Sequence, residues 1–98
     1  MARPEKLDDA SVAERLAMLP GWTVAEGKLR RAFQFDDFVQ AFAFMTASAL
    51  RAEKLDHHPE WFNVYATVQV TLATHDAGGV TALDIELAQF MDAAFLRT

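Results

Sequence analysis

The apolar positions in the first part of the chain predict a short helix that follows a polar arm. Residues 1–9 are polar, and we expect them to form a loose N-terminal arm. Val12, Leu16 and Leu19 then recur at helical spacing on one stripe. The segment Ser11-Val-Ala-Glu14 has the spacing of a capping box, so Ser11 is the expected start of this helix.

The next segment, residues 22–35, alternates between apolar and polar positions around a turn at Glu26-Gly27. This pattern predicts a β-hairpin. The second strand carries its apolar side chains on one face, and these are Leu29, Phe33 and Phe35. Arg31 interrupts that face, and the pattern offers no reason for it.

A long helix is predicted over residues 38–54, which contain neither Gly nor Pro. Asp36 is the expected N-cap, and Asp37 would favour the helix dipole in the first turn. The apolar positions form two adjacent stripes, Phe38, Phe42, Met45 and Ala49 on one and Val39, Ala43, Thr46 and Leu50 on the other. Such a width exceeds one sheet contact, so we expect one side to pack on the sheet and the other on a second subunit. A helix buried more deeply within the monomer is the alternative.

Residues 62–75 are β-prone and predict a second pair of strands with a turn near Ala66-Thr67. One face of the later strand would hold Val68, Val70, Leu72 and Thr74. A loop at residues 76–79 follows, and Thr81 and Asp84 have capping-box-like spacing before a final helix. The expected core face of that helix consists of Leu83, Leu87, Phe90, Met91 and Ala94.

The order of elements is therefore helix, strand, strand, helix, strand, strand, helix. It predicts an α+β fold in which residues 1–98 form a single domain. Four antiparallel strands covered on one face by the helices would bury the apolar faces described above.

Composition narrows the choice of partners and location. The chain is 52% apolar with eight Phe, which is rich for 98 residues and agrees with a subunit interface. The absence of cysteine excludes a disulfide framework and thiolate zinc sites. A net charge of −5 argues against nucleic acid and anionic membranes as direct partners, and no apolar run could span a membrane. We expect a small, soluble, cytosolic domain.

The groups suited to chemistry concentrate in residues 53–65. His57 and His58 are adjacent, and Pro59 restricts the backbone in front of it. Side chains of neighbouring residues on extended backbone point to opposite sides, so the two histidines need not have the same task. Glu53 lies four residues before His57, and its carboxylate could orient that ring if the helix reaches so far. Imidazoles titrate near neutral pH and could serve as general acid and base.

Three further side chains have open assignments. His75 ends a strand beside a glycine-containing loop, where reactive groups are often displayed. The histidines could instead complete helix ends, and Asp84 could be a helix-start carboxylate that the dipole favours. A metal site is disfavoured because adjacent histidines diverge and no second ligand follows at helical spacing. Trp22 is either a packing residue of an edge strand or a stacking surface for a flat heterocycle.

One long motif resembles the signature of a known protein family. Ala52-Glu-Lys-Leu-Asp-His-His-Pro-Glu-Trp-Phe-Asn-Val-Tyr65 resembles the signature of the pterin-4a-carbinolamine dehydratase family. The resemblance continues in order and at family spacing over nearly the whole chain after the arm. The further matching segments are Gly21-Trp22, Phe33-Gln-Phe-Asp-Asp-Phe38, Ala41-Phe-Ala-Phe-Met45, Thr71-Leu-Ala-Thr-His75 and Asp84-Ile-Glu-Leu-Ala88.

The resemblance implies an activity and an assembly. The activity is removal of water from 4a-hydroxytetrahydropterin to give quinonoid dihydropterin. This step recycles the pterin that aromatic amino acid hydroxylases use, for example in phenylalanine hydroxylation. The pterin is the substrate, and no metal or other cofactor is implied. Copies of the helix at residues 38–54 would pack together into a homodimer or homotetramer in the cytoplasm.

The resemblance also implies roles for individual residues. His57 and His75 match the family's acid–base histidines, and His58 matches the one associated mainly with pterin binding. Glu53 and Asp84 match acids that would orient imidazoles. The substrate-binding positions are His57, His58, Pro59, the backbone of Thr74, His75, Asp76 and Ala77, and Trp22 as an aromatic at the pocket mouth. Animal members have Glu-Cys where this chain has Asp76-Ala77, so that cysteine is not expected to be a catalytic requirement and loop contacts to the pterin are expected to differ.

A second function class remains open beside the enzyme. Some proteins of the family act as dimerisation cofactors of a homeodomain transcription factor, and others are linked to hydroxylase expression. Such a binding role would use the surface of the helix at residues 38–54 and would not need His57. The complete set of three histidines favours catalysis.

Overall fold

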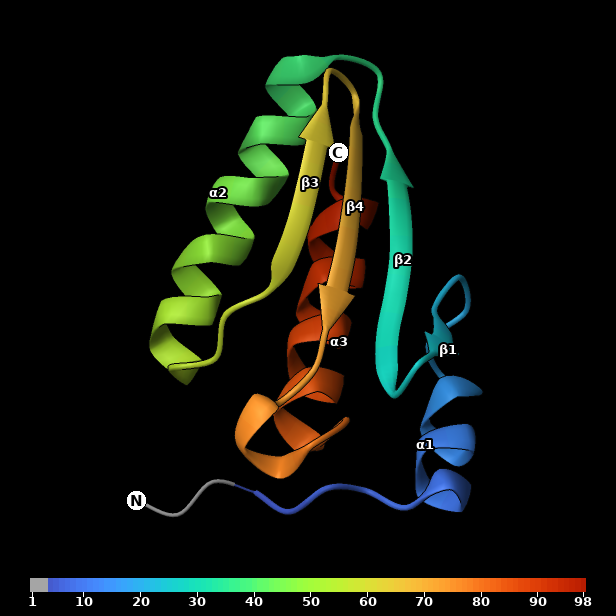
Figure 1. The fold of residues 1–98 in the computed structure, drawn as a ribbon. Helices are drawn as coiled ribbons and strands as arrows, with labels where there is room; N and C mark the ends of the chain where they lie inside the picture. The colour runs from blue at the N-terminus through green and yellow to red at the C-terminus, as the bar shows by residue number, and fades with distance from the viewer. Residues whose placement is uncertain (1–3) are drawn as a thin grey trace.

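The computed structural model describes residues 4–98, which form three α-helices, four strands and one short 3-10 helix (Figure 1). In chain order these are α1 (Asp9–Leu16), β1 (Thr23–Ala25), β2 (Lys28–Gln34), α2 (Phe38–Leu55), β3 (Glu60–Val64), β4 (Thr67–Leu72), η1 (His75–Ala77) and α3 (Ala82–Leu96). The strands form one antiparallel sheet in the order β1-β2-β4-β3. The predicted α+β fold is confirmed.

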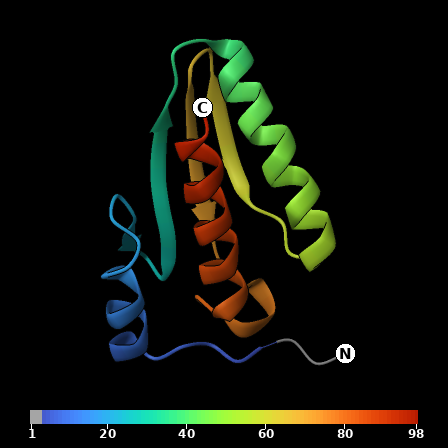
Figure 2. The same cartoon turned by 180° about the vertical axis from the view of Figure 1, so that it is seen from behind.

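Helices α2 and α3 lie on one face of the sheet, as the view from behind in Figure 2 shows. The core fills the space between the layers, because alternate residues of β2 and β4 point into it. Its largest fully buried side chains include Leu29, Phe33, Val68, Val70, Leu72, Phe44, Leu87 and Met91. Full burial of one such side chain contributes about 1.5–3 kcal/mol. The other face of the sheet remains uncovered by any helix among the described residues.

The start of the chain differs from the expectation. Residues 1–3 of the predicted arm lie outside the described residues, but the Leu7 amide donates to the Val80 carbonyl at 2.8 Å, so the arm is not loose there. The N-cap of α1 is Asp8 and not Ser11, whose own amide donates to the Asp8 carboxylate at 2.8 Å. This hydrogen bond to the Ser11 backbone lowers the pKa of Asp8. Leu19 reaches the core from the turn after α1 rather than from the helix itself.

Two short turns close the hairpins. Glu26 and Gly27 both have positive φ (55° and 73°), as a two-residue type I′ turn requires. The second turn falls at Tyr65-Ala66, one residue earlier than expected, because Val64 pairs with Thr67. The predicted buried face of β4 and its continuation to Thr74 is confirmed.

Helix α2 presents a different face to the sheet from the one that its large apolar residues suggest. Its N-cap is Asp37, which accepts from the Gln40 amide at 2.8 Å, and not Asp36. Its buried side chains are Ala41, Phe44, Ser48 and Ala52. Small residues on this side let α2 approach the other layer closely, and Phe44 fills the remaining space. The large apolar side chains of both predicted stripes are instead mostly exposed, and these are Phe38, Val39, Phe42 and Leu50.

Helix α3 begins with the predicted capping box, in which Thr81 and Asp84 each bond the other's backbone. Leu87 and Met91 are buried as expected, and Ile85 and Ala88 join them. Leu83, Phe90 and Ala94 are only partly buried. None of the described helices is long and apolar enough to cross a membrane.

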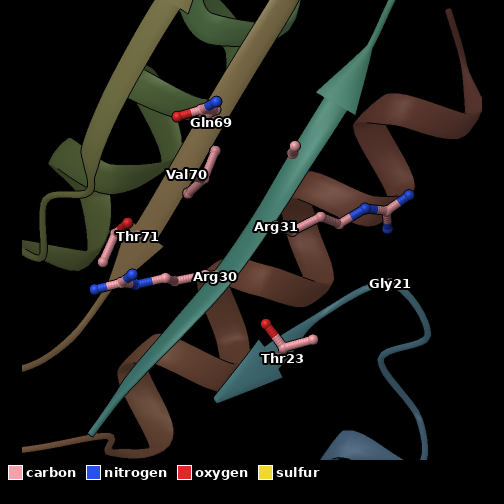
Figure 3. A pocket seen from close by; sticks show the side chains of 8 residues that line it. Gly21, Thr23, Arg30, Arg31, Gln69, Val70 and Thr71 are labelled. Atoms are coloured by element: carbon pink, nitrogen blue, oxygen red, sulfur yellow. The ribbon is translucent and has the colours of Figure 1, made fainter. Parts of the chain in front are cut away.

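Arg31, which the sequence pattern left unexplained, closes one edge of the core. Figure 3 shows Arg30 and Arg31 leaving β2 on opposite sides. The Arg31 guanidinium lies 4.3 Å from the ring centre of Phe33 and forms an ion pair with Asp92 of α3 at 2.8 Å. Its charge is therefore paired with a carboxylate while the guanidinium lies over the rings of Phe33 and Phe95.

Candidate active site

The two adjacent histidines follow directly on the end of α2. Asp56 adopts the left-handed conformation (φ 50°) and ends the helix, as expected near this position. The His57 amide then turns back to the Ala52 carbonyl at 3.0 Å. Pro59 restricts the backbone of His58 to extended conformations, and β3 begins at the next residue, Glu60. This reversal points the two imidazoles in different directions.

His57 faces the start of α3. Its ring is 4% exposed, and Nε2 lies 2.5 Å from Oδ1 of Asp84, which is fully buried. The other carboxylate oxygen of Asp84 accepts from the Thr81 amide and from the Thr74 hydroxyl, both at 2.9 Å. Asp84 therefore caps α3 and binds the imidazole of a residue 27 positions away.

His58 faces the other way and pairs with Glu53. Its Nε2 lies 2.5 Å from Oε1 of Glu53, and both side chains are exposed. The helical spacing had indicated that Glu53 could orient His57 if the helix extended that far. That interpretation is wrong, because the left-handed residue Asp56 turns His57 away from the last turn of α2.

The third histidine, His75, comes from the loop that follows β4. His75 begins η1 after β4 and the connecting residues Ala73 and Thr74, where a Thr74–Gly79 bridge holds the base of the loop with an N···O distance of 2.9 Å. Gly78 has a positive φ of 76°, which closes the loop. The imidazole of His75 is exposed.

All three histidines line one pocket of about 190 Å³, together with Ala73, Thr74 and Asp76. Glu53 and Asp84 lie behind two of the imidazoles as their hydrogen-bond partners. Pro59 and Ala77 adjoin lining residues in sequence but are not themselves among the lining residues.

Trp22 is not at the mouth of this pocket, contrary to the expectation from the resemblance. It is 5% exposed, packs edge-on against Phe33 with ring centres 5.9 Å apart, and donates Nε1 to Asp92 at 2.7 Å. Trp22 is therefore a core residue, and the one polar atom of its indole is satisfied by Asp92 of α3.

The sequence pattern did not predict the part that two hydroxyl groups, those of Thr74 and Thr81, have in the site. Thr74 was expected to contribute backbone, yet its hydroxyl bonds Asp84 and lies 2.8 Å from the Thr81 hydroxyl. Thr81 was expected only as a helix cap. The capping box was the one available signal, since it aims Asp84 back toward the start of α3.

Four titratable side chains of the site form two pairs, His57 with Asp84 and His58 with Glu53. Within residues 4–98, no three His, Asp or Glu side chains are grouped closely enough to hold a metal ion. The arrangement offers instead one buried imidazole–carboxylate pair, one exposed pair and a third imidazole. Such groups can bind a polar small molecule and exchange protons with it.

Comparison with known proteins identifies the family. Residues 5–94 match the sequence profile described as Pterin 4 alpha carbinolamine dehydratase. The chain belongs to the pterin-4a-carbinolamine dehydratase family. A Sinorhizobium medicae protein provisionally named as this dehydratase is 60% identical over 94 residues, covering 94% of this chain and 90% of the relative. A Dinoroseobacter shibae protein with the same provisional name is 58% identical over 92 residues, covering 90% of this chain and 95% of the relative.

Two solved structures share the fold. The crystal structure of a transcriptional coactivator/pterin dehydratase from Brucella melitensis superposes with a TM-score of 0.90 at 50% identity. The match covers 92% of this chain and 98% of the Brucella chain. A pterin dehydratase-like protein identified as a RuBisCO assembly factor in the alpha-carboxysome has a TM-score of 0.62 at 24% identity, over 76% of this chain and 86% of its own. That second likeness concerns the fold alone.

Proposed function

We propose that this protein dehydrates 4a-hydroxytetrahydropterin to quinonoid dihydropterin by histidine general acid–base catalysis. The observation that carries the proposal is the meeting of His57, His58 and His75 in one pocket of a chain of this family. The product would return to the aromatic amino acid hydroxylases that form the 4a-hydroxy compound.

The reaction needs two proton transfers. The C4a–O bond breaks as the hydroxyl group receives a proton and leaves as water. The lone pair on N5 forms the C4a=N5 double bond, and N5 gives up its proton to a base. One proton is accepted and one is donated, so two imidazoles in opposite protonation states suffice. The proposal therefore includes no resident metal and no cofactor besides the pterin itself.

The surroundings of the histidines support a division of labour. His57 is shielded and has a buried carboxylate behind it, so it is suited to hold a proton in a fixed direction. His75 stands on a loop at the pocket edge, and we assign it the second proton transfer. His58 is exposed and paired with an exposed acid, and we assign it mainly to substrate binding. Asp76 also lines the pocket and would contact the pterin.

The deciding experiment is a dehydration assay with purified protein after treatment with a chelator. We expect the 4a-carbinolamine to dehydrate faster than in buffer, with dihydrobiopterin acting as a competitor. A folded protein that leaves the rate unchanged would remove the enzyme from consideration. In that case the second candidate, a dimerisation cofactor or regulatory binding protein, would take its place.

The exposed apolar face of α2, formed by Phe38, Val39, Phe42 and Leu50, indicates a protein interface that the dehydratase and the second candidate would both use. We propose that a second copy of this chain covers that face, giving a homodimer or homotetramer. Four large apolar side chains on one helix of so small a chain form a surface that monomeric proteins rarely expose. This assembly is compatible with catalysis, because none of the four residues lines the histidine pocket.

A further inference from the structure

The buried carboxylate of Asp84 stands at the end of a chain of hydroxyl groups. Its Oδ2 accepts from the Thr81 amide and the Thr74 hydroxyl, each at 2.9 Å. The two threonine oxygens lie 2.8 Å apart, and the Leu83 amide approaches the Thr81 oxygen at 3.2 Å. All four residues lie where β4 leads into the loop and α3 begins.

The direction of each hydrogen bond follows from counting protons. A carboxylate can only accept, so the single hydroxyl proton of Thr74 points to Asp84. The Thr74 oxygen must then accept the contact with Thr81, which makes Thr81 the donor. The Thr81 oxygen in turn accepts from the Leu83 amide, which can only donate. One consistent chain runs from the Leu83 amide through both threonines to Asp84.

The same reasoning determines which nitrogen of His57 carries the proton. Oδ1 of Asp84 faces Nε2 at 2.5 Å, and with Asp84 as an ionised carboxylate Nε2 is the donor of this hydrogen bond. A neutral imidazole has one N–H group, so Nδ1 carries the lone pair. Nδ1 is then the atom of His57 that can exchange a proton with a bound molecule.

We propose that Thr74 and Thr81 are positioning residues that orient Asp84 so that His57 presents Nδ1 to the substrate. The catalytic part of this inference rests on the proposed dehydratase function, whereas the tautomer does not. The two hydroxyls hold one carboxylate oxygen in place, and the other oxygen is left to hold the imidazole. Removal of the Thr74 hydroxyl takes one donor from a fully buried carboxylate and leaves the Thr81 hydroxyl without its acceptor.

The tautomer can be measured without substrate. Long-range proton–nitrogen spectra of protein with ¹⁵N-labelled histidine distinguish the two neutral forms, and His58→Ala and His75→Ala samples assign the His57 signals. We expect a protonated Nε2 and an unprotonated Nδ1 at a pH where the ring is neutral. A protonated Nδ1 would overturn the inference even if the protein is an active dehydratase.

The role of the hydroxyl is tested by Thr74→Val, with Thr74→Ser as the variant that restores it. We expect Thr74→Val to lower kcat by about 10-fold or more with KM changed by less than about 2-fold, and to mix the His57 tautomers. Thr74→Ser should recover both. Thr71→Val on β4, three residues before Thr74 and outside the pocket lining, is the matched control and should change neither.

The outcomes separate this inference from the proposed function. If no variant and no wild-type sample dehydrates the pterin, the Nε2–H tautomer and its loss in Thr74→Val would still support the positioning role. If Thr74→Val leaves both kcat and the tautomer unchanged, the positioning role is wrong although the dehydratase stands.

Discussion

His57 and His58 are neighbours in sequence, yet their surroundings have little in common. His57 is buried against a carboxylate that comes from another helix, whereas His58 stays exposed beside an acid of its own helix. The chain leaves α2 at the left-handed residue Asp56, before both rings, and Pro59 follows them. Chemically similar side chains can in this way take different tasks in one reaction.

Alanine substitutions should separate these tasks. We expect His57→Ala and His75→Ala each to lower kcat by about 100-fold, because each removes a proton-transfer group. His58→Ala should mainly raise KM. Steady-state kinetics with the 4a-carbinolamine provides both constants, and equal effects on KM from all three variants would contradict this division.

A control is needed for His57, because its removal leaves Asp84 buried without its imidazole partner. His57→Gln retains an N–H donor but cannot shuttle a proton. It should be as inactive as His57→Ala while unfolding at a temperature closer to that of the wild type. Restored activity in His57→Gln would argue against acid–base chemistry at this position.

Arg31 and Arg30 provide a matched pair for stability. Replacing Arg31 by Met should cost about 1–3 kcal/mol, because Asp92 loses a charged hydrogen-bond partner in a partly buried site. Replacing Arg30 by Met should change the free energy of unfolding by less than about 0.5 kcal/mol, since its ion pair with Glu26 spans 3.9 Å and both side chains are exposed. Urea unfolding monitored by circular dichroism measures both, and similar losses would contradict the packing assigned to Arg31.

At the scale of elements, α2 combines two unlike faces. Its inner face consists of small residues around Phe44, and its outer face carries the larger apolar side chains. The usual association of large apolar residues with the core therefore misidentifies the side that meets the sheet. The ends of the helix are set by local chemistry, with a carboxylate cap at the start and a left-handed residue at the end.

The start of α2 can be tested with two adjacent aspartates. We expect Asp37→Ala to destabilise the protein by about 1 kcal/mol, because the Gln40 amide loses its side-chain acceptor. Asp36→Ala should have a much smaller effect. Thermal unfolding of the two variants compares them directly, and a larger loss for Asp36→Ala would place the helix start one residue earlier.

At the scale of the whole molecule, the sheet has helices on one face, and the histidine pocket lies where the end of α2, the end of β4 and the start of α3 meet. The exposed apolar face of α2 belongs to the same helix but consists of other residues. Site and proposed interface can thus change independently.

Charged substitutions on the exposed face of α2 should dissociate the proposed homo-oligomer into monomers. Val39 is 74% exposed and Phe42 is 56% exposed, so a glutamate at both positions costs the monomer little and opposes an apolar contact. We expect the double variant to be a monomer by light scattering. Met18→Glu, at a residue 75% exposed beside α1, is the control and should keep the oligomer. An unchanged mass in the double variant would rule out this face as the interface.

The sequence by itself determined the features that depend on near neighbours. Helix and strand periodicity, the capping box of α3, the first hairpin turn and the histidine motif with its family resemblance are all encoded within short segments. The fold class followed from their order. Small errors remained at helix starts, where Asp8 and Asp37 cap in place of Ser11 and Asp36, because several nearby residues could serve.

Only the tertiary structure decided which distant groups meet. It paired Asp84 with His57 and left Glu53 to His58, moved Trp22 into the core, supplied Asp92 for Arg31 and turned the small-residue side of α2 inward. The physical reason is the same in each case. A side chain's partner across the fold depends on how helices rotate and pack, and the spacing of residues within one element carries no information about that rotation.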